Sequence, residues 1–335
     1  YSGPTWYVQT DGSDTDGTGS TDSPFASIQS AINFATTTGD SVTVTAGTYV
    51  ENINFRGRNI RVVGAGRETT IIDGNQSGRV ITIDNQENSG TLLKNFTIQN
   101  GYATGEFPDY RGGGIYCGHN TSPILESLKI INNQSEREAG GIKLSDTNAK
   151  IRNVIIKDNY AASEGGGIAG GGGGTPILEN VLIVGNNGGN GGGIYLEGSM
   201  SPIIINSTLT GNISRSSNGG AIACNRTSHP VLFNSILWYN SPSEIYLSAF
   251  ESESDYSSMT IDFSNISGGL DSVTAVQGTT LNWGSDNINL SPAFVDTAIS
   301  DYHLSDLSPA ISAGTDTITI AGVLYSAPTT ALDGI

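Results

Sequence analysis

The feature that most constrains this sequence is a repeat. Between residues 93 and 240 the chain carries six copies of the pattern apolar-x-x-small/apolar-x-apolar-x-x-Asn, as in Leu125, Leu128, Ile130 and Asn133. A second element recurs with it, a run of glycines that ends in isoleucine, as in the segments 112–115 and 191–194. The two elements together define a unit of about 26 to 28 residues, which predicts a solenoid of stacked coils.

Two kinds of solenoid fit the first half of this unit, because Leu-x-x-Leu-x-Leu-x-x-Asn is also typical of a leucine-rich repeat. The second half distinguishes them. A leucine-rich repeat would form a helix or 3₁₀ segment there, whereas this chain has glycine runs followed by alternating side chains, as in Gly-Gly-Gly-Ile-Tyr-Leu at 191–196. Glycine disfavours a helix by roughly 1 kcal/mol per residue, and alternation indicates a strand. The sequence therefore predicts an all-β chain, a parallel β-helix with at least two strands in each coil.

The asparagine that ends each pattern is expected to lie at a turn. Asn133, Asn159 and Asn186 occupy this place in successive units. Side-chain amides at equivalent places in stacked coils can form a hydrogen-bonded ladder, and asparagine tolerates left-handed backbone at turns. We expect these residues to stack along the axis of the solenoid.

Length and composition fit one elongated domain. A β-helix grows by adding coils that contact only their neighbours, so 335 residues need no second core. We expect a single domain over 1–335, with an N-terminal loop and cap helix at 1–40, coils at 41–250, and C-terminal strands and a cap at 251–335. The net charge is −17, and residues 158–335 hold two of the 15 basic residues against 16 acidic ones. This acidity argues against nucleic acid as a partner.

Both cysteines follow the repeated isoleucine by two places. Cys117 and Cys224 should thus share one inward column four coils apart, which corresponds to roughly 19 Å at about 4.8 Å per strand. This distance is too long for a disulfide, so we expect two buried free thiols. The sequence contains no long apolar run, and membrane insertion is not expected.

The first 40 residues suggest a cap for the first coil. Ile28, Ala31 and Ile32 follow helical spacing, and Ser23 is placed as a possible N-cap. Before them, the loop with Asp11, Asp14, Asp16 and Asp22 resembles a calcium loop only in part, because Gly12 stands at the first ligand position and Ser23 stands where the bidentate glutamate would be. An Asx-turn loop is the simpler interpretation, and a calcium site is the alternative.

The two ends of the chain resemble a known family. The opening segments 8–14, 39–44 and 46–49, together with the tail segments 291–296, 301–304 and 308–315, are similar to secreted bacterial right-handed parallel β-helix repeat proteins of the pectate-lyase-like superfamily. The tail is similar to that of members with a C-terminal surface-anchoring region, although Ser312 stands where those tails usually have aspartate. The resemblance implies a right-handed parallel β-helix that is extracellular or on the cell surface. It does not imply one activity, because the superfamily includes lyases, hydrolases, epimerases and adhesins.

Enzymes of this superfamily act on polysaccharides in a groove along an outer sheet, so the outward positions are the candidates for a site. One outward column follows the repeated isoleucine, and a second lies four residues before it. The first column is Tyr116, Lys143, Ala169, Tyr195 and Ala223, and the second is Arg111, Glu138, Glu164, Asn190 and Asn218. Carboxylates about 5 Å apart repel each other, so Glu138 and Glu164 predict either a Ca²⁺ ligand pair or one raised pKa.

A lyase acting on a uronic-acid polymer must neutralise the substrate carboxylate, remove a proton and protonate the leaving oxygen. The resemblance implies Ca²⁺ for the first task and a lysine or arginine for the second. Lys143, with Arg111 and Arg137 beside it, is the basic group that fits the catalytic role, and Tyr116, Tyr195 and His119 are the candidates for substrate binding. The alternative is a solvated surface on which Glu138 pairs with Arg111 or Arg137, as exposed charges commonly do.

The strand that ends in asparagine has an apolar outward face. Its outward side chains include Ile155, Leu182, Ile236 and Trp238. Such a face is expected to be covered, either by the tail after residue 250 or by self-association with another copy. The sequence therefore supports two functions. One is a secreted β-helix that binds or cleaves an extracellular polysaccharide, as a lyase or a glycoside hydrolase, and the alternative is a non-catalytic structural or adhesive surface protein.

Overall fold

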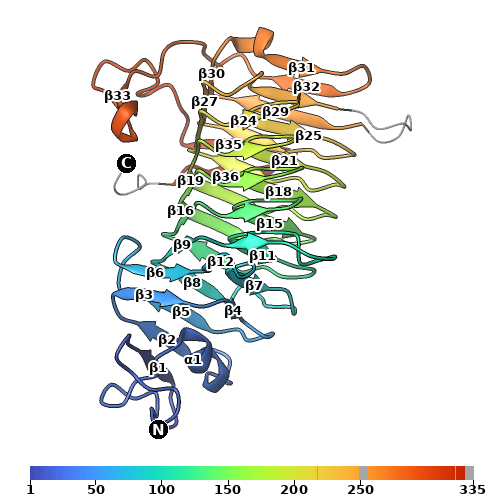
Figure 1. The fold of residues 1–335 in the computed structure, drawn as a ribbon. Helices are drawn as coiled ribbons and strands as arrows, with labels where there is room; N and C mark the ends of the chain where they lie inside the picture. Colours follow the sequence, from blue (N-terminus) through green and yellow to red (C-terminus); the bar gives the residue numbers. More distant parts are fainter. Residues whose placement is uncertain (217, 249–255, 321, 329–335) are drawn as a thin grey trace.

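The computed structural model describes residues 1–216, 218–248, 256–320 and 322–328. Within them the chain winds into a parallel β-helix whose coils stack along one axis, from the N-terminal end to the last strands (Figure 1). Each strand pairs in parallel with the equivalent strand of the next coil, and three sheets run along the axis. The fold class predicted from the repeat is confirmed.

Two of the three sheets form the side of the molecule that bears the candidate site. The nine-stranded sheet includes the strands that follow the glycine runs, and the five-stranded sheet is narrow because its strands have two residues each. The nine-stranded sheet contains β4 (Ile53–Asn54), β7 (Ile81–Ile83), β11 (Ile115–Cys117), β15 (Ile142–Ser145), β18 (Ile168–Gly171), β21 (Ile194–Leu196), β25 (Ile222–Cys224), β28 (Ile245–Leu247) and β31 (Val273–Ala275). The five-stranded sheet contains β10 (Tyr102–Ala103), β14 (Gln134–Ser135), β17 (Tyr160–Ala161), β20 (Asn187–Gly188) and β24 (Ile213–Ser214).

The third sheet has 18 strands among the described residues and forms the opposite side. In most coils it contains two short strands separated by a bend, which merge into one long strand in β16 and β19. Its members are β1 (Thr5–Val8), β2 (Ser41–Val44), β3 (Gly47–Val50), β5 (Arg61–Gly64), β6 (Thr70–Asp73), β8 (Leu92–Lys94), β9 (Thr97–Gln99), β12 (Ile124–Glu126), β13 (Lys129–Ile131), β16 (Lys150–Lys157), β19 (Ile177–Val184), β22 (Ile203–Ile205), β23 (Thr208–Thr210), β26 (Val231–Phe233), β27 (Ile236–Trp238), β29 (Ser258–Asp262), β30 (Asn265–Ile266) and β32 (Thr280–Trp283).

The parallel pairing extends beyond the range 41–250 expected for the coils. At the N-terminal end β1 pairs with β2, and at the other end β31 and β32 still pair with β28 and β29. The residues between β28 and β29 include 249–255, which lie outside the described residues. The coils therefore continue to Trp283 before the irregular tail begins.

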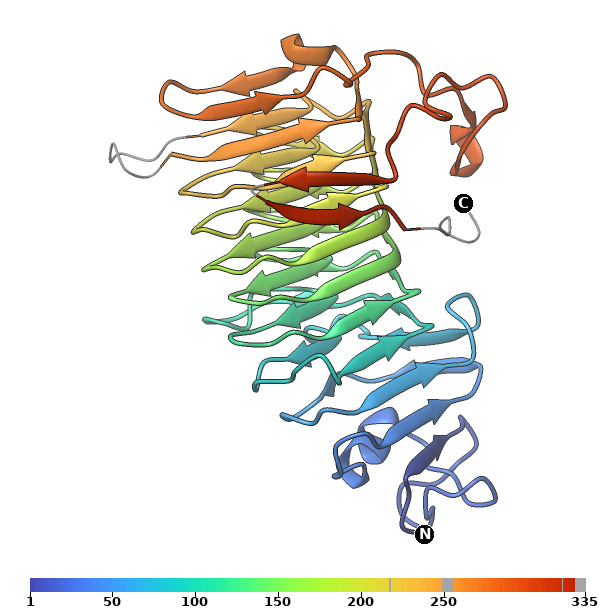
Figure 2. The same cartoon turned by 180° about the vertical axis from the view of Figure 1, so that it is seen from behind.

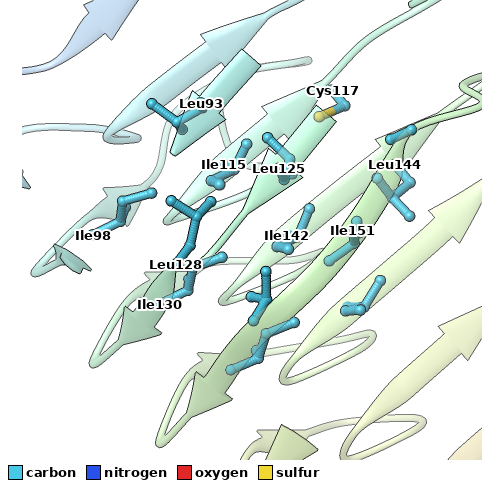
Figure 3. Packing of buried hydrophobic residues seen from close by; sticks show 14 of the residues in the cluster. Leu93, Ile98, Ile115, Cys117, Leu125, Leu128, Ile130, Ile142, Leu144 and Ile151 are labelled. Atoms are coloured by element: carbon cyan, nitrogen blue, oxygen red, sulfur yellow. The ribbon is translucent and has the colours of Figure 1, made fainter. Parts of the chain in front are cut away.

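The core is a continuous column of aliphatic side chains inside the coils. Ile115, Ile142, Leu125 and Ile151 point toward one another from facing sheets (Figure 3), and all four are fully buried. The strand register puts Cys117 and Cys224 in one inward column with Leu144, Gly170 and Leu196 between them. Both cysteines are buried and free, as predicted.

The predicted asparagine ladder is present and buried. In each rung the backbone N–H and the Nδ2 of one asparagine donate to the Oδ1 of the asparagine in the next coil. Asn159, for example, donates to Asn186 at 3.0 and 2.9 Å. The ladder consists of Asn133, Asn159, Asn186, Asn212 and Asn240.

The left-handed backbone lies one residue before the ladder, not at the ladder residues themselves. Asn132, Asp158 and Gly185 have φ values of 55°, 54° and 66°, whereas the ladder asparagines do not have positive φ. The expectation that the stacked asparagines would themselves be left-handed is therefore wrong. The preceding residue makes the turn, and the asparagine is left in a conformation from which its amide points along the axis.

A short helix covers the first coil, as expected. Helix α1 (Ile28–Phe34) buries Ile28, Ala31 and Ile32, and its N-cap is Ser27, whose side chain accepts a hydrogen bond from the backbone N–H of Ser30. The prediction of Ser23 as the N-cap is wrong, because Phe25 is extended and pairs with Val8, so the helix begins later. No helix in the described residues is long and apolar enough to cross a membrane.

The C-terminal tail covers the apolar face of the 18-stranded sheet. Tyr302 of β34 (Asp301–Leu304) packs against Ile155, Leu182 and Val184. The hairpin of β35 (Thr317–Ile320) and β36 (Val323–Ser326) lies across the same sheet (Figure 2), where Ile318 and Tyr325 pack against Ile203, Ile205 and Phe233. Strand β34 pairs with β33 (Phe294–Asp296), and two 3₁₀ segments lie at Gly269–Ser272 and Thr297–Ile299.

The apolar face of the 18-stranded sheet, predicted as a possible surface for self-association, is largely buried within the chain. Ile155, Leu182 and Trp238 are at most 8% exposed, and Ile236 lines a cavity of about 370 Å³ between the sheet and the tail. Coverage by the tail was the simpler of the two predictions for this surface, and the structure confirms it for Ile155 and Leu182. These side chains are consequently not presented to a second copy.

Candidate active site

Both outward columns predicted from the repeat are present in the strand register. Tyr116, Lys143, Ala169 and Tyr195 are successive partners across β11, β15, β18 and β21. At the edge of the same sheet, isolated bridges join Arg111 to Glu138, Glu138 to Glu164, and Glu164 to Asn190. The candidate residues are thus brought together because each occupies the same place in its own coil.

Glu138 is the charged centre of the site, and it is held by two cations. The Nζ of Lys143 lies 2.6 Å from one of its carboxylate oxygens, and the guanidinium of Arg111 lies 2.7 Å from the other. Glu138 is 5% exposed and Lys143 is 2% exposed. The two cations lower the pKa of Glu138 against the opposing effect of burial, which is the largest single influence. Glu138 is therefore a buried ion.

Lys143 points outward from the sheet but is not open to solvent. Two glycines make room for it. A Cβ on Gly112 would lie 3.1 Å from the Cβ of Lys143, and a Cβ on Gly171 would lie 3.3 Å from its Nζ. Lys143 thus lies beside a carboxylate and not in an open cleft. Its ammonium group is committed to Glu138.

Glu164 is the neighbour of Glu138 with the opposite character. It is half-buried, and its pKa is raised to about 7, first by burial and then by the negative charges of Glu197 and Glu138, against the weaker effects of Lys143 and Arg137. The prediction of one raised pKa in the Glu138 and Glu164 pair is thereby supported. Near neutral pH Glu164 holds a proton that it can donate, while Glu138 beside it stays ionised.

The coil of Glu164 has small residues where it crosses the nine-stranded sheet, and they are buried. After Ile168 it continues with Ala169 and five glycines, so no large side chain stands between Lys143 in the coil before and Tyr195 in the coil after. Ala169 is nevertheless fully buried, and a Cβ on Gly171 would meet Lys143 and Glu197, so side chains of the neighbouring coils cover this backbone.

Tyr195 lies in the coil after that of Glu164 and Tyr116 lies two coils before it, and both present little surface. Tyr116 is 3% exposed, because the guanidinium of Arg79 lies 4.6 Å from the centre of its ring. Tyr195 is 5% exposed, and its hydroxyl accepts a hydrogen bond from Asn225 at 3.3 Å. Burial raises the pKa of both phenols. Neither ring is placed to stack on a ligand without movement, so their predicted role in substrate binding is limited to the edges that remain exposed.

Of the other predicted residues, Arg137 lies at the site and His119 lies away from it. Arg137 is exposed, its guanidinium is 5.1 Å from the centre of the Tyr110 ring, and its charge acts on Glu164. His119 is in the turn after β11, where its Nδ1 lies 2.5 Å from a carboxylate oxygen of Asp146. The structure records no interaction between His119 and the Glu138 or Glu164 carboxylates.

Three groups at the site were missed by sequence reasoning. Glu197 follows β21, and its negative charge raises the pKa of Glu164. The guanidinium of Arg226 lies 3.6 Å from one of the carboxylate oxygens of Glu197. Arg79 reaches the site from another coil. The third group is a loop with exposed Phe107, which stacks on Arg111 at 4.6 Å.

That loop had a signal in the sequence. Thirteen steps along the chain separate Tyr102 from Ile115, whereas eight separate the equivalent Gln134 and Ile142 in the next coil. The five additional residues are an insertion at the corner between the five-stranded and nine-stranded sheets, next to the edge column of Arg111, Glu138 and Glu164. Departure from the repeat length thus marks the site.

The residues present do not fit a calcium ion. Both oxygens of Glu138 are occupied by Lys143 and Arg111, which leaves Glu164 alone as a ligand in the predicted pair. In the N-terminal loop, Asp14 accepts hydrogen bonds from the backbone N–H groups of Ala26 and Ser27, as expected of a structural turn. In the described parts of the chain no three His, Cys, Asp or Glu residues gather in a group that could hold a metal.

Comparisons with known proteins do not show a family for this chain. No family model matches the chain, and no curated protein matches it. Among solved structures, a pectin methylesterase from carrot covers 82% of this chain and 87% of its own at 12% identity, with a TM-score of 0.48. A rhamnogalacturonan lyase covers 91% and 95% at 14% identity and the same TM-score, and a pectin methylesterase from Yersinia enterocolitica covers 82% and 98% at 13% identity and a TM-score of 0.43. TM-scores below 0.5 carry no argument about function.

Proposed function

We propose that this chain binds and cleaves a polysaccharide along the outer face of the nine-stranded sheet, with Glu164 as the proton donor. The observation that carries the proposal is the contrast between two adjacent carboxyl groups. Glu138 is kept ionised by Lys143 and Arg111, and Glu164 keeps its proton to about pH 7. Pairs of carboxyl groups whose environments separate their pKa values are typical of acid-base sites.

The chemistry that fits this pair is hydrolysis of a glycosidic bond. Glu164 transfers its proton to the bridging oxygen as the bond from that oxygen to the anomeric carbon breaks. Glu197 is a carboxylate whose charge acts on Glu164, and we assign to it the proton from the water that attacks the anomeric carbon. The ionised Glu138 does not take part in the proton transfers. It holds the pKa of Glu164 up and keeps Lys143 in place.

Hydrolysis is favoured over the predicted elimination because of Lys143. A lyase needs a base that is free to approach the sugar ring, and the ammonium of Lys143 is buried in an ion pair at 2.6 Å. Separation of a buried pair leaves two unpaired charges, which is costly. Since calcium does not fit at Glu138 and Glu164, no step is assigned to it.

The surroundings of Glu164 are suited to a sugar polymer. Phe107 is 62% exposed on the inserted loop, where its ring can cover one face of a pyranose, and Tyr160 is 42% exposed on the five-stranded sheet. Past Glu164 the edge continues with the amides of Asn190 and Asn218, which are bonded to each other at 2.7 Å. An extracellular or surface location remains a prediction from the resemblance.

The test is incubation with a panel of neutral and uronic-acid polysaccharides, with two readouts. New reducing ends would report any cleavage, and ultraviolet absorbance of an unsaturated uronide would report elimination. We expect new reducing ends without the absorbance, unchanged by added Ca²⁺ or by a chelator. Reducing ends accompanied by the absorbance would replace hydrolysis with the lyase reaction.

A matched pair of variants connects the activity to the site. Glu164→Gln should lower turnover by about 10²–10⁴-fold, the usual contribution of a general acid. Glu179→Gln is the control, since Glu179 is in the same coil on β19, in the opposite sheet. Equal activity of Glu164→Gln and the unmodified chain would refute the proposed proton donor.

A further inference from the structure

A cavity lies on the N-terminal coils, apart from the Glu164 site. Its volume is about 430 Å³, within the range of small-molecule sites. It is open to solvent and is bordered by the ends of β4 and β7 and by two loops that precede β7 and β11. The side chains that line it are Asn52, Ile53, Asn54, Ser77, Arg79, Thr82, Thr104 and Asp109, together with Gly78.

This cavity stands on the same outward column as the Glu164 site. Asn54 pairs with Thr82, Thr82 with Tyr116, and Tyr116 with Lys143. Three strand spacings separate Thr82 from Ala169 in the coil of Glu164, or about 14 Å. Arg79 connects the two places, because it lines the cavity and lies over the ring of Tyr116. A chain of several sugar units could occupy both.

The charges in the cavity wall are already paired with each other. The guanidinium of Arg79 donates to the carboxylate of Asp109 at 3.2 Å and to the carbonyl of Pro108 at 2.7 Å. A ligand carboxylate would have to compete with Asp109 for Arg79, and a ligand cation would have to compete with Arg79 for Asp109. Neither charged ligand gains a free partner here.

The other polar groups are amides and hydroxyls. Asn52 is committed to the wall, since its Nδ2 donates to the carbonyl of Arg79 and its Oδ1 accepts from Ser77. Two groups retain hydrogen-bonding capacity: in the described chain, neither the hydroxyl of Thr82 nor the Nδ2 of Asn54 has a protein partner. Uncharged donors and acceptors without partners fit a ligand that is rich in hydroxyl groups and carries no charge.

We propose that this cavity is a subsite for a neutral sugar residue of the substrate, about 14 Å from the point of cleavage. The inference rests on the proposed function and adds to it the class of sugar, a pyranose without a carboxylate at this position. Thr82 and Asn54 supply the hydrogen bonds, and the ion pair of Arg79 with Asp109 forms an electrically neutral wall.

The experiment measures binding separately from cleavage. Hexasaccharides of neutral sugars from xylan, glucan and galactan, and a hexasaccharide of galacturonate, would be titrated calorimetrically into the Glu164→Gln protein. The blocking variant is Thr82→Tyr, because tyrosine is already accommodated in this column at 116, 195 and 246. The matched control is Thr274→Tyr, the same change at an exposed position of the same column at the far end of the sheet.

We expect at least one neutral hexasaccharide to bind more tightly than the galacturonate, and Thr82→Tyr to weaken its affinity tenfold or more while Thr274→Tyr leaves it unchanged. Unchanged affinity in Thr82→Tyr would overturn the subsite, as would a loss confined to the galacturonate. Failure of the subsite alone would leave cleavage by the unmodified chain dependent on Glu164. Failure of the proposed function would instead appear as absent cleavage with hexasaccharide binding that is still sensitive to Thr82→Tyr.

Discussion

The carboxylate of Glu244 accepts the two hydrogen bonds from Asn240 that, in every earlier rung, go to the next asparagine. The Nδ2 of Asn240 lies 2.6 Å from one carboxylate oxygen, and its backbone N–H lies 3.3 Å from the other. Asn212 makes the same two bonds to the Oδ1 of Asn240. Strand β27 pairs with β30 so that Leu237 lies beside Ile266, and the same register puts Gly269 beside Asn240. Because Gly269 has no side-chain amide, the ladder ends at Glu244.

Glu244 should make stability depend on pH. It is 3% exposed, and burial raises its pKa to about 7 from an ordinary value of 4.5. Between these values the unfolded chain loses the proton and the folded chain keeps it, so stability falls as pH rises and levels off above about pH 7. The total change for this group is about 3 kcal/mol. Thermal unfolding of Glu244→Gln should lack this part of the pH dependence.

Glu164 acts in the same direction over the same pH range, so the two contributions must be separated. Glu164→Gln should remove its own part, and the double variant should remove both. Glu179→Gln is the control and should retain the pH dependence of the unmodified chain. A Glu244→Gln protein with the unmodified pH profile would contradict the role given to this carboxyl.

The interior of the ladder should be sensitive to the loss of one amide. Asn186→Ala removes the acceptor for two donors of Asn159 and leaves the carbonyl of Ile156 without its donor. Each buried polar group that loses its partner costs about 1–3 kcal/mol, so we expect a total loss near 3 kcal/mol in denaturant unfolding. Asn282→Ala is the control, because Asn282 is exposed. Equal stability of the two variants would mean that the ladder adds little.

Lys143 should prove to be a structural residue. Lys143→Met leaves Glu138 with Arg111 as its one remaining cation and should destabilise the fold by about 3 kcal/mol, as broken buried ion pairs do. Lys143→Met combined with Glu138→Gln removes both charges and should restore most of the loss in urea unfolding. If Lys143→Met unfolds like the unmodified chain but has no turnover, the predicted catalytic base would be reinstated.

The activity should follow the protonation of Glu164. As the donor it must hold its proton, so turnover should decrease tenfold per pH unit above about pH 7, where Glu164 ionises. Arg137 lowers the pKa of Glu164 through its positive charge. In Arg137→Gln the decrease in turnover at alkaline pH should therefore begin at a higher pH. Rates measured across pH 5–9 with the reducing-end assay would show this. If the alkaline decrease in turnover begins at the same pH in Arg137→Gln, the assignment of Glu164 as the proton donor would be contradicted.

The sequence predicted the fold because the repeat leaves little freedom. Inward isoleucines and ladder asparagines must occupy the same place in every coil, so the register of Tyr116 with Lys143 and of Glu138 with Glu164 followed directly. The coverage of Ile155 by the tail could also be predicted from the sequence, since a large apolar face is seldom left in water.

The sequence did not predict how deeply the site is buried. A side chain that points outward from a strand is not necessarily exposed: Lys143 extends over Gly112 and Gly171 to reach Glu138, so its charge lies inside the surface. The helix start was also misplaced, because Phe25 pairs with Val8 and delays the cap to Ser27. Both errors concern contacts between residues far apart in the sequence, which a local pattern does not contain.

The five residues inserted between β10 and β11 leave the register on both sides unchanged, since Tyr102 still pairs with Gln134 and Ile115 with Ile142. At such a corner the surface loop can change in length while the stacked coils keep their pairing. Loops of other lengths could be grafted there, and recognition could diverge among descendants of this chain, while the inherited core stays the same.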